Sequence, residues 1–164
     1  MTTLKDLAQA QDVFELIQGD WATLKADAET VRRAVFIDEQ GIDESEEWDT
    51  DDERSDHVIV RRQAGQVVGT GRLIPQDEPV SDVGRVCRLG RIGRMSVIKS
   101  CRGLGVGERI LNALLDTARQ KGFARVEISA QVAAQGFYSR AGFMADGEVY
   151  DEVGIPHQAM FKQL

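Results

Sequence analysis

Hydrophobic positions follow two different periods along the first half of the chain. Residues 14–17 form an apolar run of strand length, and residues 57–62 and 67–74 are β-branched runs on either side of the turn sequence QAGQ. We therefore expect a strand near the N-terminus and, later, an antiparallel hairpin. Between them, a helix is predicted from apolar residues at helical spacing, namely Trp21, Leu24, Ala28, Val31 and Val35.

The second half of the chain continues as alternating strands and helices. Residues 89–97, LGRIGRMSV, alternate like a strand, and their glycines permit a bulge. A helix with a broad apolar face is expected over residues 106–118, because its apolar residues recur every three or four positions. Further elements are expected as a strand at 125–130, a short helix within 133–143, and strands at 143–149 and 157–164.

Together these elements predict a mixed α/β fold with a mainly antiparallel sheet flanked by helices. The order strand, glycine-rich loop, helix, strand after residue 89 predicts a right-handed crossover between two parallel strands. The chain has 164 residues, of which 42% are hydrophobic, and no internal linker divides it. We expect one domain over residues 13–164, preceded by a mobile arm over residues 1–12.

Charge and cysteine content exclude several classes of protein. The net charge of -7 disfavours nucleic acids and anionic membranes as partners, because both are negatively charged. No apolar run is long enough to span a bilayer, and Cys87 and Cys101 suit a cytoplasmic protein with free thiols. The two histidines are isolated in the sequence, so no metal site is expected.

An unusually acidic segment extends from Asp38 to Asp56. It holds eleven acidic residues, one arginine and no apolar periodicity. This composition is typical of a solvated surface loop, and we expect one here. Alternatively, the negative charge could attract a cationic substrate.

A glycine-rich loop precedes the helix over residues 106–118. The first turn of a helix has unpaired backbone N–H groups and a partial positive charge, which together attract an anion. Glycines at 103, 105 and 107 would let a phosphate reach those amides, and Arg102 adds a full charge. The alternative is a glycine-rich turn that only lets the helix pack closely on a strand.

The spacing of these glycines separates three phosphate-binding patterns. Neither the P-loop pattern nor the dinucleotide pattern G-x-G-x-x-G matches the loop. The pattern [QR]-x-x-G-x-[GA] does match, at residues 102–107. In this context it resembles the pyrophosphate loop of the GNAT superfamily of acyl-CoA-dependent N-acyltransferases. Residues 133–143, AAQGFYSRAGF, resemble a later helix of the same superfamily, and VFIDEQGI at 35–42 resembles its ElaA-like branch.

The GNAT resemblance implies acetyl-CoA as the co-substrate and a sheet that is splayed at its centre to admit it. The pantetheine arm would pair with the backbone of the strand before the loop, and the pyrophosphate would bind the loop itself. The cofactor-binding residues implied in this way are Met95, Ser96, Val97, Arg102, Gly103, Leu104, Gly105, Val106 and Gly107. The chain departs from the family in lacking an asparagine within residues 131–135 and a glutamate on the central strand.

The resemblance also gives Tyr138 the role of general acid toward the departing CoA thiolate. At helical spacing Phe137 and Ala141 share one stripe and are expected to be buried, whereas Tyr138 points about 100° away from them. Without the resemblance, Tyr138 would be interpreted as one more core aromatic residue.

An ammonium group must lose a proton before it can attack a thioester, so a general base is also expected. The candidates are Glu39, Asp43, His57 and His157, and the sequence does not select one of them. Glu39 is expected to act as the base or to contact the acceptor. Gln40, Gln131 and His157 are expected on the acceptor side.

These observations predict an N-acetyltransferase that moves an acetyl group directly to a primary amine in a ternary complex, with the oxyanion held by a backbone amide near Met95–Val97. The amine could belong to a small molecule or to a protein, and the sequence leaves both the acceptor and the oligomeric state open. Two alternatives are covalent catalysis through Cys87 or Cys101 and a non-catalytic acyl-CoA sensor.

Overall fold

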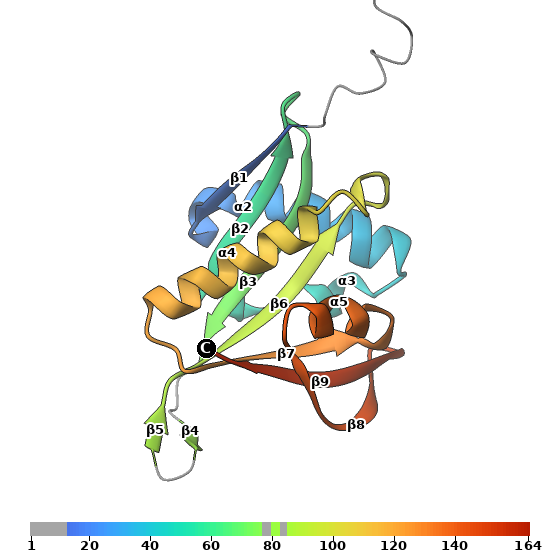
Figure 1. The fold of residues 1–164 in the computed structure, drawn as a ribbon. Helices are drawn as coiled ribbons and strands as arrows, with labels where there is room; N and C mark the ends of the chain where they lie inside the picture. The colour runs from blue at the N-terminus through green and yellow to red at the C-terminus, as the bar shows by residue number, and fades with distance from the viewer. Residues whose placement is uncertain (1–12, 77–79, 83–84) are drawn as a thin grey trace, which may run out of the picture.

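The computed structural model describes residues 13–76, 80–82 and 85–164, so the arm expected at 1–12 lies outside the described residues. Helices and strands occur throughout the chain (Figure 1). They are β1 (Phe14–Gly19), α2 (Trp21–Arg32), a π-helical segment (Arg33–Glu39), α3 (Glu44–Glu47), a 3-10 helix (Thr50–Arg54), β2 (Asp56–Arg62), β3 (Val67–Pro75), β4 (Val80–Asp82), β5 (Arg85–Cys87), β6 (Leu89–Val97), a 3-10 turn (Lys99–Cys101), α4 (Val106–Gln120), β7 (Arg125–Gln131), a 3-10 turn (Val132–Ala134), α5 (Gln135–Arg140), β8 (Met144–Glu152) and β9 (Ile155–Gln163).

Within the described residues, the main sheet has seven strands in the order β1-β2-β3-β6-β7-β9-β8. Neighbouring strands are antiparallel except β6 and β7, which α4 connects as parallel neighbours. The predicted mixed sheet, its hairpin and its crossover helix are therefore confirmed. The small antiparallel ribbon of β4 and β5 was not expected from the sequence.

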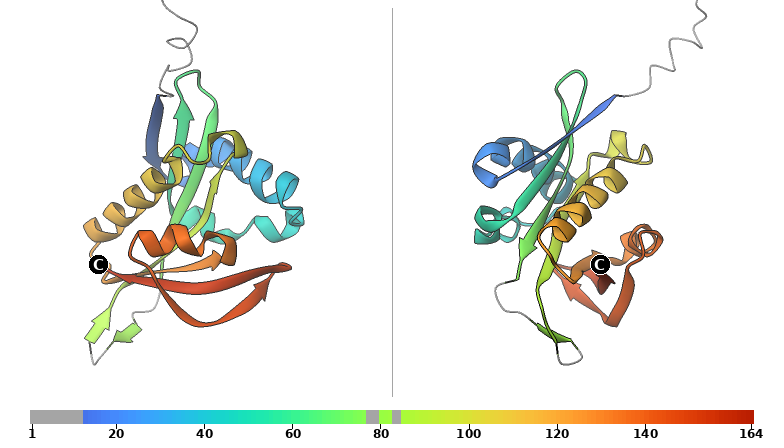
Figure 2. Two further views of the ribbon diagram at one scale, coloured as in Figure 1. Left: turned by 45° about the vertical axis from the view of Figure 1, so that its right-hand side comes forward. Right: turned by 60° about the vertical axis from the view of Figure 1, so that its left-hand side comes forward.

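Helices cover both faces of the sheet: α2 and α3 lie on one face, and α4 and α5 on the other (Figure 2). The apolar face expected for α4 is buried as a whole, because its stripe packs on β2, β3 and β6. Its buried residues are Val106, Ile110, Leu111, Leu114, Leu115 and Ala118.

Helix α2 begins where its sequence predicts. The side chain of Asp20 accepts a hydrogen bond from the Thr23 backbone N–H at 2.9 Å, which caps the first turn. Leu24, Ala28 and Val31 are buried on the expected face. The helical path then continues as the π-helical segment, which holds the first five residues of the family-like stretch VFIDEQGI and contacts β6.

The prediction of a solvated loop over Asp38–Asp56 is only partly right, because most of its acidic side chains are exposed but the segment is neither irregular nor solvated throughout. Short helices form in this segment, and the carboxylates of Glu47 and Asp52 are buried. Arg32 donates to both carboxylates, at 2.6 Å and 2.7 Å, and Arg72 donates to Asp52 at 2.8 Å. The partners of these acids are distant in sequence, so a charge count within the segment could not reveal their burial.

Candidate active site

The sheet opens between β6 and β7. Their parallel pairing runs from Leu89 opposite Arg125 to Ile92 opposite Ile128 and stops there. Both strands continue further, β6 to Val97 and β7 to Gln131. The backbone of β6 beyond Ile92 is thus an edge to which an extended ligand could add hydrogen bonds, and the expected splay is confirmed.

A bulge bends β6 at the start of this open edge. On its other side, Thr70 pairs with Ser96 and Arg72 pairs with Gly93, so two residues of β6 face one residue of β3. The bulged residue Arg94 has a φ of 53°, which is uncommon for a residue other than glycine. A bulge was expected here, but its left-handed residue is an arginine and not one of the neighbouring glycines.

The acidic segment holds this bulge in place. The Arg94 guanidinium donates to the Glu47 carbonyl oxygen at 3.0 Å and lies 3.1 Å from the Glu47 carboxylate and 3.2 Å from that of Asp49. Burial lowers the pKa of Arg94, and these acidic partners oppose the effect. The segment expected to be solvated therefore positions the strand that borders the opening.

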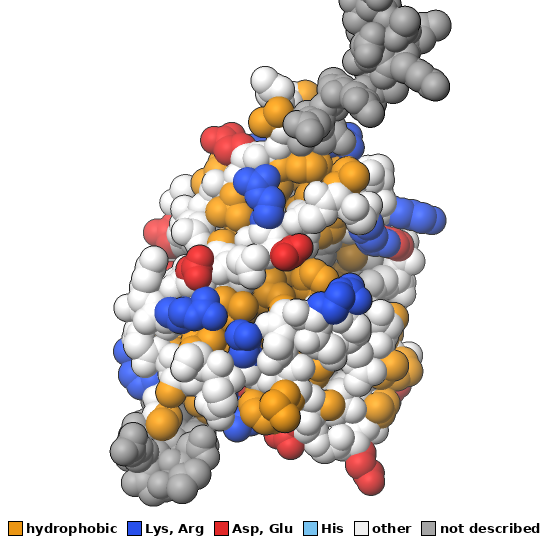
Figure 3. Space-filling model, viewed as in Figure 1, with side chains coloured by type: hydrophobic (Ala, Val, Ile, Leu, Met, Phe, Trp, Pro, Cys, Tyr) orange, Lys and Arg blue, Asp and Glu red, His pale blue; other side chains and the backbone are white. Residues whose placement is uncertain are grey.

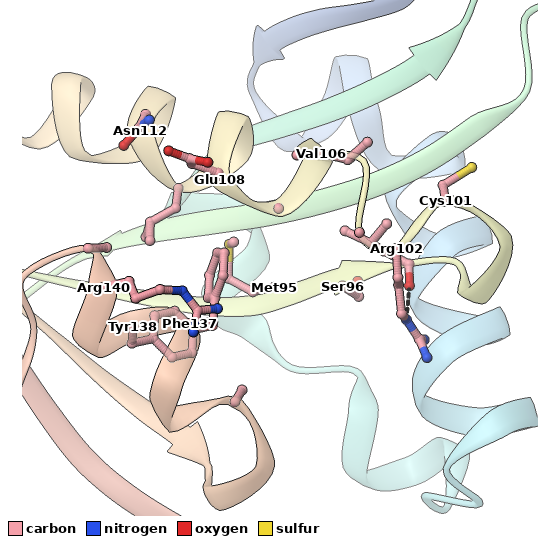
Figure 4. Close-up of a pocket in the computed structure, with 17 residues that line it drawn as sticks. Met95, Ser96, Cys101, Arg102, Val106, Glu108, Asn112, Phe137, Tyr138 and Arg140 are labelled. Atoms are coloured by element: carbon pink, nitrogen blue, oxygen red, sulfur yellow. Dashed lines mark hydrogen bonds between the residues drawn. The ribbon is translucent and has the colours of Figure 1, made fainter. Parts of the chain in front are cut away.

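A cavity of about 750 Å³ lies beside the open edge of β6 (Figure 4). It is formed by β6, the glycine loop, α4 and α5, and hydrophobic side chains are exposed in this region of the surface (Figure 3). It contains every predicted cofactor-binding residue except Leu104, whose side chain is 50% exposed and lies outside the lining. The lining consists of Met95, Ser96, Val97, Cys101, Arg102, Gly103, Gly105, Val106, Gly107, Glu108, Leu111, Asn112, Ala134, Phe137, Tyr138, Arg140 and Ala141.

The glycine loop has the geometry of an anion site. Gly103 and Gly105 have φ values of 76° and 81°, and Gly105 is the N-cap residue of the long helix α4. A Cβ atom at either position would meet no atom within 4 Å. These two glycines are therefore required by the left-handed backbone and not by close packing. Without side chains at these positions, the amides at the start of α4 stay uncovered.

Arg102 connects the glycine loop to two other elements. Its Nε donates to the Val97 carbonyl oxygen at 2.9 Å, and its two terminal nitrogens donate to the two oxygens of Glu39 at 2.6 Å each. This hydrogen bonding holds the pKa of Glu39 below its usual value. Because a carboxylate with a lowered pKa is a weaker base, Glu39 is poorly suited to deprotonate an amine.

Tyr138 lies deeper in the cavity wall than the sequence predicted. It is 6% exposed, whereas Phe137 and Ala141 are only partly buried, so the expected division between them is reversed. The Tyr138 ring packs edge-on against Phe137 and Phe143, and burial raises its pKa. Among the described residues, none forms a hydrogen bond with its hydroxyl, which leaves that donor available to a ligand.

Sequence reasoning missed three polar residues of the lining, Glu108 and Asn112 on α4 and Arg140 on α5. Figure 4 shows Arg140 extending into the cavity. No carboxylate in the described part of the chain pairs with it. The helical spacing could have predicted Arg140, because it follows Phe137 by three positions and so projects from the same side of the helix.

The residues expected on the acceptor side come together at the end of β7. Gln131 Nε2 donates to Gln40 Oε1 at 2.9 Å, and Gln131 pairs with His157 across β7 and β9. The other two candidate bases lie elsewhere. Burial against Trp21 lowers the pKa of His57, and Asp43 caps α3, where hydrogen bonding by Ser45 lowers its pKa.

In the described part of the chain, no group of His, Cys, Asp and Glu residues lies close enough together to bind a metal ion. None of its helices is long and apolar enough to cross a bilayer. Both cysteines are free thiols, Cys101 buried in the cavity wall and Cys87 half-buried.

Comparison with known proteins agrees with the fold. A family model described as an acetyltransferase (GNAT) domain matches residues 23–164. YjcF of Bacillus subtilis, described as an uncharacterized N-acetyltransferase, is 34% identical over 138 residues, which cover 83% of this chain and 90% of YjcF. ElaA of Escherichia coli is 31% identical over 136 residues, covering 82% of this chain and 84% of ElaA.

Two crystal structures share the fold over most of the chain. That of Escherichia coli ElaA superposes with a TM-score of 0.77 at 26% identity and covers 92% of this chain and all of ElaA (100%). An acyl-CoA N-acyltransferase from Pseudomonas aeruginosa superposes with a TM-score of 0.73 at 29% identity, covering 92% of this chain and 99% of that protein.

Proposed function

Since the chain belongs to the GNAT acetyltransferase family, whose members use acyl-CoA, we propose that it transfers an acetyl group from acetyl-CoA to a primary amine in a ternary complex. The observation that carries this proposal is the glycine loop. Gly103 and Gly105 hold left-handed backbone with open space before them, at the N-terminus of α4 and beside the unpaired edge of β6.

Each part of acetyl-CoA has a counterpart in the cavity. The pyrophosphate would accept hydrogen bonds from the amides of residues 103–107, to which Leu104 contributes only its backbone. The pantetheine arm would pair with β6 at Met95–Val97, as an added strand does. Arg140 supplies a positive charge in the same cavity, because it has no carboxylate partner among the described residues.

The chemistry follows from these positions. Attack of the amine on the thioester carbonyl places a negative charge on oxygen, which a backbone N–H near Met95–Val97 would stabilise. Collapse of this intermediate expels the CoA thiolate, and we assign Tyr138 as its proton donor. The raised pKa keeps Tyr138 protonated at neutral pH, and a thiolate in the same buried surroundings is correspondingly more basic.

Two other assignments complete the proposal. The described thiols are free, which suits the reducing cytoplasm as the location of the protein. Residues 13–164 would form one domain, since strands from both ends of this range, β1 and β9, belong to the same seven-stranded sheet. The acceptor would be a small molecule or a protein that carries a primary amine.

Incubation with acetyl-CoA labelled in its acetyl group, over a panel of amines, tests this function. We expect label on the nitrogen of at least one amine and none on the protein after denaturation. Label retained on Cys101, which lies in the cavity wall, would instead indicate covalent catalysis. Tight binding of acetyl-CoA without transfer to any amine would indicate a sensor.

A further inference from the structure

Four polar side chains from three strands meet on the face of the sheet opposite α4. Ser129 of β7 forms hydrogen bonds with the Tyr150 hydroxyl of β8 and, at 3.1 Å, with Glu152 Oε2. The same Glu152 oxygen lies 3.3 Å from His157 Nε2 on β9. The rings of Tyr150 and His157 are stacked, with centroids 6.1 Å apart. We name these four residues the β7–β9 cluster.

Strand geometry explains why the cluster can form. Ser129 pairs with Ala159 on β9, and the small alanine side chain lets residues of β8 reach across that strand to Ser129. Tyr150 pairs directly with His157 on the adjoining strands. The side chains of Tyr150 and Glu152 are exposed, whereas His157 is only 7% exposed. The cluster thus has an open side and a buried imidazole behind it.

The imidazole has one defined orientation. His157 Nδ1 lies 2.7 Å from the carbonyl oxygen of Ile155, which can only accept a hydrogen bond. Nδ1 must therefore carry a proton, and the lone pair of the neutral ring is on Nε2. Because Nε2 lies 3.3 Å from Glu152 Oε2, the basic atom of the neutral ring faces the polar cluster.

The cluster adjoins the opening between β6 and β7. Val126, Ile128 and Ala130 of β7 are buried in the core together with α4 and Tyr138. Ser129 and Gln131 alternate with them and so face the opposite side of the sheet. Ser129 is also the first residue of β7 beyond its last pair with β6. The cavity and the cluster therefore lie on opposite sides of one gap in the sheet.

We propose that the β7–β9 cluster is the acceptor site, where Glu152 and Ser129 bind an alkylammonium group and His157 Nε2 removes its proton. This inference rests on the proposed function, because it assigns the second substrate of that reaction. A carboxylate beside hydroxyl groups suits a cation with several N–H donors. β8 adds to the attraction, since it carries Asp146, Glu148, Asp151 and Glu152 and no lysine or arginine.

The proton balance of the reaction is then complete. The ammonium group loses one proton to His157, and the resulting amine attacks the carbonyl carbon, so that the C–N bond forms and a π electron pair moves to oxygen. When that pair returns, the C–S bond breaks, and the thiolate takes a proton from Tyr138. Tyr138 is reprotonated by the second proton that nitrogen loses, and His157 releases its proton to solvent.

The first test compares the two histidines of the chain. With acetyl-CoA and an amine that the wild-type protein acetylates, His157→Gln should lower kcat/KM for the amine about 100-fold at neutral pH. CoA affinity, measured by calorimetry on the same sample, should be unchanged. His57→Gln is the matched control, because His57 is likewise buried but lies on β2, which β3 and β6 separate from the gap between β6 and β7, and it should keep kcat/KM within about twofold.

The second test uses pH and an exposed member of the cluster. As pH rises toward about 10, the free amine forms without a base, so the deficit of His157→Gln should shrink. The groups from β8 that face His157 are Glu152 and Tyr150, and β7 adds the uncharged Ser129 to the cluster. The variant Tyr150→Phe should show whether the phenol contributes to the pH dependence of kcat/KM. Glu152→Gln, at an exposed position, should raise the KM for the amine about tenfold and leave CoA affinity unchanged.

The outcomes separate the inference from the function on which it rests. A wild-type protein that acetylates no amine overturns both. An active wild-type protein whose His157→Gln and Glu152→Gln variants keep wild-type kinetics overturns only the acceptor site. A His157→Gln deficit that stays constant with pH shows a structural role and overturns His157 as the base.

Discussion

Glu39 and Arg102 face each other through both carboxylate oxygens and both terminal guanidinium nitrogens, at 2.6 Å each. Glu39 ends the π-helical segment, and Arg102 begins the proposed pyrophosphate loop. The pair thus joins the segment similar to the ElaA-like branch to the CoA side of the cavity. A carboxylate beside a proposed phosphate site opposes an incoming anion.

The first prediction follows from this opposition. Glu39→Gln removes the negative charge and leaves the full charge of Arg102 to the ligand, so we expect CoA to bind about two- to fivefold more tightly. Calorimetric titration at two salt concentrations measures this, and the gain should shrink at higher salt. Glu44→Gln is the matched control, because it breaks a comparably exposed pair, with Arg33, outside the cavity lining. Weaker CoA binding by Glu39→Gln would contradict the expectation.

The same pair predicts a pH dependence of stability. Because the pKa of Glu39 is lowered by Arg102, its contribution to stability is complete above the usual glutamate value of 4.5. It declines as pH falls through the lowered value. Wild-type protein should therefore melt slightly above Glu39→Gln at pH 7, and the difference should vanish in acid. Thermal melts of both proteins across pH check the sign, and a difference that grows in acid would be inconsistent with it.

Tyr138→Phe separates catalysis from packing. The phenyl ring keeps the contacts with Phe137 and Phe143, and no described residue loses a hydrogen bond. We expect melting temperature and CoA affinity close to wild type, with kcat lowered roughly tenfold to a thousandfold. Steady-state kinetics on an identified acceptor provide the measurement. A variant with wild-type kcat would show that the tyrosine only packs.

Arg94 offers a test of the bulge. Left-handed backbone destabilises a residue other than glycine by about 1 kcal/mol or more. Because Arg94 has this conformation, the free energy of unfolding of Arg94→Gly should exceed that of Arg94→Ala by about that amount. Both variants lose the contacts with Glu47 and Asp49, which makes the comparison specific to the backbone. At Arg119, on α4, the order should be reversed, because glycine is less favourable than alanine in a helix. Chemical denaturation gives the free energy of unfolding of all four variants. If glycine and alanine rank in the same order of stability at both positions, Arg94 is not strained.

Local pattern predicted most of the fold for physical reasons. The apolar stripe of α4, the turn between β2 and β3 and the glycine loop each lie within a short stretch of sequence, and periodicity describes such stretches well. The cofactor-binding residues of the cavity could be predicted as well, because the loop and β6 are adjacent in sequence and meet at one end of α4.

What the sequence did not predict depends on partners that are distant along the chain. Burial of Glu47 and Asp52 requires Arg32, Arg72 and Arg94, which arrive from α2, β3 and β6. The β7–β9 cluster is assembled by strand register, which brings Ser129 within reach of Glu152. Neither arrangement has a periodic signal, because only the tertiary fold determines the neighbours.

The central claim is that the glycine loop binds the pyrophosphate of acyl-CoA. A ligand that binds the native state raises the melting temperature, so acetyl-CoA and CoA should stabilise the protein and NAD and ATP should not. Equal shifts with all four ligands would remove the specificity on which the proposed function rests.

Calorimetric titration of CoA into Gly105→Val and Gly65→Val tests this claim most directly. Both glycines have positive φ, 81° and 91°, and a Cβ atom at either would meet nothing within 4 Å, so the two variants carry similar backbone strain. Gly65 lies in the turn between β2 and β3, outside the cavity lining, whereas Gly105 caps α4 within it. We predict that Gly105→Val loses at least tenfold in CoA affinity and that Gly65→Val binds CoA like the wild type. Equal CoA affinity in the two variants would contradict the assignment of the loop.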